Sequence, residues 1–175
     1  PTMRVTLVTI GSRGDAEPYV ALGRALARAG HSVRVATCEP FRGLVAEQGL
    51  EFVRLGGDIK ALVGDEGRAA LAATESSPLG AFRALRRYVG PLVREAMEAL
   101  PEALSGSDVV IGHLLVPGAA SYAERHGALY IDASYVPVFP TTAFAHPGAP
   151  PSTPRGALSL LSHVVAEQLF WQAFR

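Results

Sequence analysis

Several features that would decide the class of this protein at once are scarce in its 175 residues. Cys38 is the only cysteine, which excludes an internal disulfide scaffold. Acidic and basic residues cancel to a net charge of zero, so there is no basic excess for binding nucleic acid. No apolar run reaches the length of a membrane span, and no leader pattern precedes the first strand-like segment. We therefore expect a cytoplasmic protein without an integral membrane segment.

Apolar residues are plentiful, at 49% of the chain, and supply enough material for a buried core. The length is typical of one domain, and we find neither an internal repeat nor a linker. Cys38 ends an apolar run and is expected to be a small core residue rather than a reactive thiol.

Strand-like and helix-like segments alternate along the chain, which favours an α/β fold. We expect a Rossmann-like parallel sheet with helices on both faces. Residues 56–77 are irregular, with one short helix expected at 68–73, and Gly90-Pro91 is expected to kink the long amphipathic stretch. The expected strands are 4–10, 32–38, 51–55, 108–112 and 128–133, and the expected helices are 18–29, 41–49, 79–100, 117–126 and 157–174.

The segment Gly11 to Pro18, GSRGDAEP, follows the first expected strand, where ligands bind in open parallel sheets. It lacks the Gly-Lys-Ser/Thr of a phosphate-binding loop and the Gly-x-Gly-x-x-Gly spacing of a dinucleotide site. The embedded Arg-Gly-Asp is too short to indicate adhesion. A purely structural interpretation is that Asp15 caps a helix that begins at Glu17-Pro18.

This segment, continued by YVALGRALARAGHSVRVAT, resembles the start of glycosyltransferases with the GT-B fold that modify sterols, glycopeptide antibiotics and macrolides. Ala16 stands where that family usually has valine. The segments FRGLVAEQGLEFVRLGGD and SDVVIGHLLVPGAASYAERHGALYI match later parts of the pattern, so the resemblance extends from Met3 to about Phe139.

The resemblance implies inverting transfer of a sugar from a nucleotide sugar, UDP- or dTDP-linked, to a hydroxyl of a lipophilic acceptor. It points to Asp15 as the general base, with Ser12 beside it in the acceptor site. The alternative for Asp15 is a role limited to capping or to positioning the acceptor. His113, at the end of the fourth expected strand, either orients Asp15, contacts the acceptor or shares the proton, or is a hydrogen-bonded histidine without a catalytic part. Asp108 is expected to be a turn residue.

The loop from Ser134 to Gly156 combines aromatic and proline residues, as a wall for a lipophilic acceptor would. Its candidate acceptor-binding residues are Tyr135, Phe139, Phe144 and His146. The alternative is that the prolines only stiffen an exposed loop. Leu79, Phe82 and Leu85 are more consistent with core packing than with the same pocket.

The family's His-x-Gly-Gly-x-Gly-Thr-like donor motif does not occur before Arg175. We therefore expect residues 3–175 to be the acceptor-binding domain of a larger enzyme, inactive without its C-terminal nucleotide-sugar domain. No cofactor or metal is expected. The sequence leaves open whether the protein forms an oligomer. Two alternatives remain: a non-catalytic small-molecule binding module on the same fold, and another parallel-sheet enzyme such as a methyltransferase or reductase.

Overall fold

A computed structural model describes residues 1–56, 83, 85–113 and 115–173. The chain divides into two compact units, Pro1–Ala133 and Ser134–Arg175. The border falls where the proline-rich loop begins, although the sequence shows no linker there. Each unit is described by itself.

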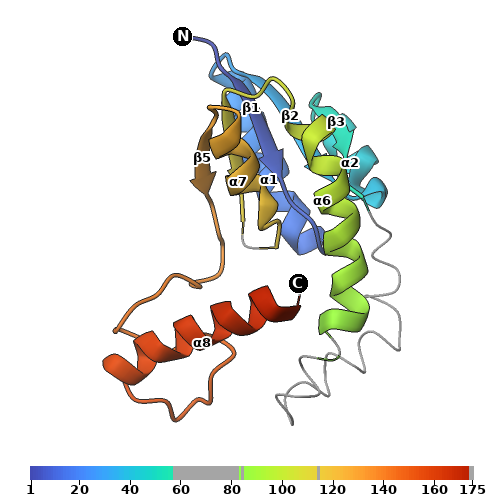
Figure 1. Cartoon of the computed structure of the whole chain (residues 1–175). Coiled ribbons are helices and arrows are strands. Elements are labelled where there is room, and N and C mark those ends of the chain that lie inside the picture. Colours follow the sequence, from blue (N-terminus) through green and yellow to red (C-terminus); the bar gives the residue numbers. More distant parts are fainter. Residues whose placement is uncertain (57–82, 84, 114, 174–175) are drawn as a thin grey trace. The chain divides into compact units, whose positions relative to one another are not determined.

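The first unit is built on a five-stranded sheet in which all neighbouring strands are parallel (Figure 1). The strand order is β3-β2-β1-β4-β5. Val5 to Val8 of the central strand are all buried, as expected for a strand covered on both faces. The parallel α/β fold is thereby confirmed. The strands are β1 Arg4–Val8, β2 Ser32–Thr37, β3 Glu51–Arg54, β4 Val109–Gly112 and β5 Leu129–Asp132.

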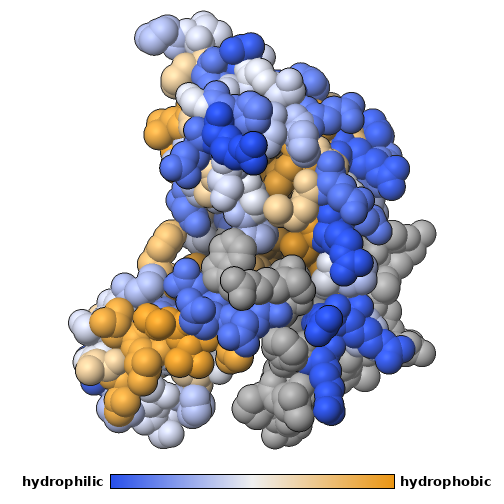
Figure 2. Space-filling model, viewed as in Figure 1, coloured by the Kyte–Doolittle hydropathy of each residue, from blue (hydrophilic) through white to orange (hydrophobic). Residues whose placement is uncertain are grey.

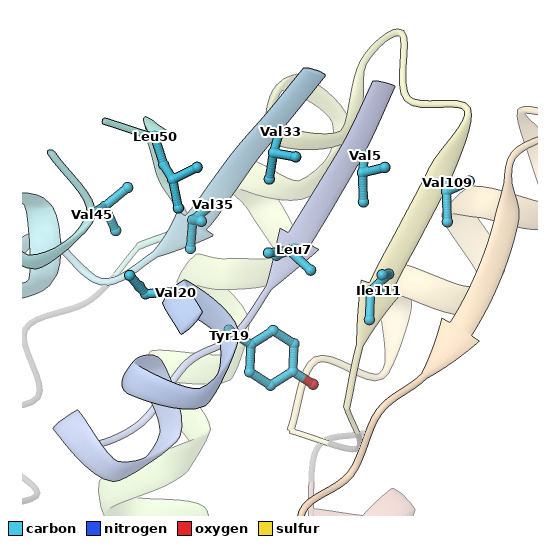
Figure 3. Packing of buried hydrophobic residues seen from close by; sticks show 10 residues of the cluster. All are labelled: Val5, Leu7, Tyr19, Val20, Val33, Val35, Val45, Leu50, Val109 and Ile111. Carbon is cyan, nitrogen blue, oxygen red and sulfur yellow. The ribbon is translucent and has the colours of Figure 1, made fainter. Parts of the chain in front are cut away.

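Helices cover both faces of this sheet. On one face, α1 and α2 pack on aliphatic side chains of β1, β2 and β4, with Tyr19 of α1 near Leu7 and Val20 near Val35 (Figure 3). On the other face α6 and α7 supply buried residues such as Ala96 and Ala119. These helices are α1 Arg13–Arg28, α2 Arg42–Ala46 after the 3-10 turn η1 Glu39–Phe41, α6 Gly90–Leu104 and α7 Gly118–Arg125.

The expected break at Gly90-Pro91 corresponds to a change of helix type. The π-helical turn η3, Leu85–Val89, ends there and α6 begins at Gly90. Pro91 lies in the first turn of α6, where its missing N–H has no helical acceptor to lose. Leu79, Phe82 and the helix expected at 68–73 lie outside the described residues.

The second unit consists of the loop from Ser134 and the helix α8, Ala157–Ala173. The residues of α8 that are buried are polar, Ser159 and His163. Apolar side chains of α8 remain exposed and form the hydrophobic area over this helix in Figure 2; they are Leu158, Leu160, Leu161, Val164, Val165 and Leu169.

The order of the strands creates a switch point beside β1. From β1 the chain proceeds to β2 and β3 on one side and then returns to place β4 on the other side. In open parallel sheets the crevice beyond the carboxyl ends of two such strands is the usual ligand site. Here the segments that follow β1 and β4 begin at Thr9 and His113.

Candidate functional site

The turn after β1 brings Asp15 back onto Ser12. The helix α1 begins at Arg13, with Ser12 as the N-cap and Asp15 at the third helical position. The carboxylate oxygen Oδ2 of Asp15 accepts hydrogen bonds from the backbone N–H of Ser12 and from its hydroxyl at 2.7 Å. The helix therefore starts five residues earlier than the sequence pattern predicts. Ser12 and not Asp15 is its N-cap, but the Asp15 carboxylate still caps the helix start from the third helical position, as the partner of Ser12 in a capping box.

Gly11 makes this return possible. Its φ of +130° belongs to a region that residues with a side chain rarely adopt. A Cβ at this position would also overlap the Asp15 carboxylate, whose Cγ lies only 2.8 Å from that position. Only glycine thus lets the chain turn this tightly against the carboxylate.

His113 lies beside this turn, because it continues β4 as Thr9 continues β1. The side chain is 4% exposed, and its Nε2 is 3.0 Å from the hydroxyl oxygen of Thr9. Its Nδ1 accepts a hydrogen bond from the N–H of Leu115 at 3.3 Å. Burial lowers the pKa of His113, and the negative charges of Asp15 and Asp132 offset part of that effect. The imidazole is therefore stabilised in its neutral form.

Two further side chains complete the surroundings of the turn. The ring of Tyr19 lies 5.5 Å from that of His113, and its hydroxyl donates a hydrogen bond to the carbonyl of Ala133. Cys38 follows β2 and is fully buried, as expected. Burial raises the pKa of its thiol, and a hydrogen bond with the backbone of Gly11 offsets part of the rise. This thiol is held in its unreactive, protonated form.

Asp108 lies at the opposite edge of the sheet. It forms an exposed ion pair with Arg4 at 2.9 Å, and hydrogen bonds from Arg4 lower the pKa of Asp108 to about 2. A hollow of about 460 Å³ lies at the same edge, between the end of α6 and His126. Both features are at the amino ends of the strands, away from the turn after β1, and the expected turn role of Asp108 agrees with this position.

The second unit gathers two of the four acceptor-site candidates around His163. The ring of Phe144 lies 6.0 Å from the His163 ring and that of His146 5.4 Å from it. Burial lowers the pKa of His146, and the charge of His163 adds to this. Tyr135 and Phe139 are exposed, at 45% and 53%.

Sequence reasoning missed Thr9 and His163. Thr9 reads as an ordinary strand residue, and only its register opposite His113 reveals a polar role. His163 had a signal, since a histidine within an otherwise apolar helical segment needs polar partners when buried. Its two ring nitrogens lie 3.2 Å from the carbonyl oxygens of Val138 and Phe144.

Two general features of the described residues bear on the kind of protein. They contain no group of three or more His, Cys, Asp or Glu side chains placed to hold a metal ion. Within the same ranges, no helix combines the length and the apolar character that crossing a bilayer requires.

Comparison with known proteins identifies relatives across nearly the whole chain. Residues 5–144 match the model of the glycosyltransferase family 28 N-terminal domain. A sterol 3-beta-glucosyltransferase of Candida albicans is 31% identical over 169 residues, which are 96% of this chain and 11% of that protein. A sterol 3-beta-glucosyltransferase of Arabidopsis thaliana is 29% identical and matches 100% of this chain, which corresponds to 29% of its own length. The chain thus spans only a small part of these relatives.

Solved structures of glycosyltransferases share the fold. The glycotransferase of kitacinnamycin superimposes on 79% of this chain, 32% of its own, with a TM-score of 0.56 and 24% identity. A Streptomyces sp. SF2575 glycosyltransferase complexed with thymidine diphosphate covers 94% of this chain and 43% of its own, with a TM-score of 0.52 and 24% identity. The N-terminal half of a GT-B fold, expected from the sequence, is confirmed at the level of fold.

Proposed function

The chain belongs to the glycosyltransferase family 28 N-terminal domains, and from this premise we propose that residues 3–175 are the acceptor-binding domain of an inverting glycosyltransferase. The larger enzyme would transfer a sugar to a hydroxyl of a lipophilic acceptor. The observation that carries the proposal is the carboxylate of Asp15, held by Ser12 in the turn after β1, at the switch point of the sheet.

Asp15 is assigned the role of general base. The acceptor hydroxyl attacks the anomeric carbon of the sugar from the face opposite the nucleotide. As the new C–O bond forms, the bond from the anomeric carbon to the nucleotide's phosphate oxygen breaks, and the hydroxyl proton passes to the carboxylate. A side chain within hydrogen-bond reach that takes such a proton typically contributes about 10²- to 10⁴-fold in rate. The two bonds from Ser12 hold the carboxylate in place before the acceptor arrives.

His113 is assigned a supporting role. A general base needs a lone pair that points to the substrate, and the Nδ1 lone pair of His113 already accepts the N–H of Leu115. The other ring nitrogen faces Thr9 in a buried position. The sequence left four roles open: His113 orients Asp15, contacts the acceptor, shares the proton, or is a hydrogen-bonded histidine without a catalytic part. These contacts argue against sharing the proton, and we propose that His113 helps to position Asp15 through Thr9.

Four residues of the second unit are proposed as contacts for a lipophilic acceptor. Tyr135, Phe139 and Phe144 offer exposed aromatic surface, which suits an apolar ligand. His146 offers a polar group in the cluster around His163 that also contains Phe144. The relatives named above act on sterols. These four residues remain predictions as acceptor contacts, as does Ser12.

The donor is proposed to be a UDP- or dTDP-linked sugar bound by a C-terminal domain. One of the similar structures holds thymidine diphosphate, which is the leaving group expected from a dTDP-sugar. No metal or resident cofactor is proposed. The cytoplasmic location and the oligomeric state also stay predictions.

The test is Asp15→Asn in the whole protein, assayed with radiolabelled UDP- and dTDP-sugars and a panel of sterol and polyketide acceptors. We expect kcat to fall by about 10²-fold or more, because the amide cannot take the proton. Glu17→Gln is the matched control, since Glu17 lies in the same helix and pairs with exposed Arg13. Equal kcat values in Asp15→Asn and the wild type would refute the assignment of Asp15 as the general base. Acceptor binding without any transfer by the whole protein would instead favour the non-catalytic binding module.

A further inference from the structure

Thr9 links Asp15 and His113, two residues of the candidate site that are far apart in the sequence. Its side chain is fully buried, and its hydroxyl oxygen lies 3.0 Å from Nε2 of His113 and 3.1 Å from the backbone carbonyl oxygen of Asp15. The Thr9 side chain, directly after β1, therefore joins His113 at the end of β4 to Asp15 in the first turn of α1.

The protons on this connection can be assigned from its acceptors. A hydroxyl carries one hydrogen, and the carbonyl of Asp15 can only accept, so Thr9 donates to it. The Thr9 oxygen must then accept from His113, which places the ring hydrogen on Nε2. The N–H of Leu115 points to Nδ1, which fits the same tautomer because Nδ1 is then the acceptor. Three hydrogen bonds agree on one neutral imidazole.

We propose that Thr9 is a positioning residue, which sets the place of Asp15 through its backbone and fixes His113 as the Nε2–H tautomer. The catalytic part of this inference rests on the proposed function of Asp15, whereas the tautomer does not. Threonine suits the role because branching at Cβ restricts its χ1, so the direction of the hydroxyl is set by the backbone. The backbone of Thr9 is itself held in place, because its N–H donates to the carbonyl of Ala36 and so extends the hydrogen bonding between β1 and β2.

Three variants separate this role from a general loss of stability. Thr9→Val keeps the shape and removes the hydroxyl, and Thr9→Ser keeps the hydroxyl. Thr6→Val is the matched control, because Thr6 is equally buried in β1 and its hydroxyl bonds to Ser107 at the opposite edge of the sheet. His113→Gln identifies the resonances of His113 in spectra of the protein.

The first measurement is the ¹⁵N NMR spectrum of ring-labelled histidines in the 175-residue chain, which distinguishes the two neutral tautomers. We expect Nε2–H at His113 in the wild type, in Thr9→Ser and in Thr6→Val. In Thr9→Val only the Leu115 N–H still favours this tautomer, and its population should fall. A protonated Nδ1 at His113 in the wild type would overturn the inference, as would an unchanged His113 spectrum in Thr9→Val.

The second measurement is kcat and KM of the whole protein, determined separately for each variant. We expect Thr9→Val to lower kcat about tenfold with little change in KM, the effect of losing one typical buried hydrogen bond in the transition state. Thr9→Ser should restore kcat, and Thr6→Val should not change it. Equal kcat in Thr9→Val and Thr6→Val would overturn the positioning role. If Asp15→Asn is also fully active, Asp15 is not the general base. The tautomer of His113 is decided separately, by the NMR measurement.

Discussion

Replacing Gly11 with alanine should be far more damaging than the same change at Gly14, three residues along the same turn. Holding a residue with a side chain at the φ of Gly11, +130°, costs about 1–3 kcal/mol. The new Cβ would also overlap the Asp15 carboxylate and disrupt its bonds to Ser12. Loss of an N-terminal capping interaction costs about 0.5–2 kcal/mol. We expect Gly11→Ala to lower the free energy of unfolding by about 2–4 kcal/mol in total.

Gly14→Ala is the control, because the Cβ it adds would meet only the Ser12 hydroxyl, at 3.6 Å. Gly14 lies in the first turn of α1, and alanine is favoured over glycine in helices by up to about 1 kcal/mol, so this variant should be unchanged or slightly more stable. The assay is urea-induced unfolding of the chain, followed by circular dichroism and fitted with a common slope. Equal midpoints for the two variants would refute the account of the turn given above.

Two other outcomes follow from buried polar groups. Because burial lowers the pKa of His113 below its usual 6.5, the unfolded chain binds more protons than the folded one as the pH falls below that value. The free energy of unfolding should therefore fall between pH 7 and 5, and less steeply in His113→Gln; parallel curves would show that His113 is not the source. Thr37 is fully buried, and its hydroxyl has no hydrogen-bond partner among the described residues. We expect Thr37→Val to raise the free energy of unfolding by about 1 kcal/mol, measured by thermal melting, and a decrease would show that the hydroxyl is satisfied.

The sequence allowed the sheet to be predicted because its signals are local. Each strand is a short segment rich in β-branched or other apolar residues and bounded by turn residues. Each boundary lies within two residues of the expected one. The start of α1 was missed for a local reason as well. Pro18 looks like the first residue of a helix, yet proline needs only a position where its missing N–H is tolerated. Ser12 and Asp15, three residues apart, already satisfy the helix start.

The contacts that build the site were beyond local reasoning. Thr9 and His113 are separated by 104 residues, and they meet because Leu7 pairs with Ile111, so each is two residues past that pair. That register depends on how β1 and β4 pair, and no sequence motif specifies this pairing. The strand order that places β4 beside β1 follows from the family's fold, so Asp15 and His113 could be assigned to one edge of the sheet but not connected atom by atom.

The polar residues of α8 determine its rotation about its own axis. A helix normally turns its apolar side inward, and rotation is then set by the hydrophobic effect. In α8 the side turned inward carries Ser159 and His163, and leucines and valines such as Leu161 and Val165 face outward. The hydroxyl of Ser159 donates to the carbonyl of Pro154, and both His163 nitrogens face loop carbonyls. The rotation of α8 about its axis is thus specified by hydrogen bonds, and a hydrophobic replacement of His163 would leave Ser159 as the remaining buried polar residue that fixes it.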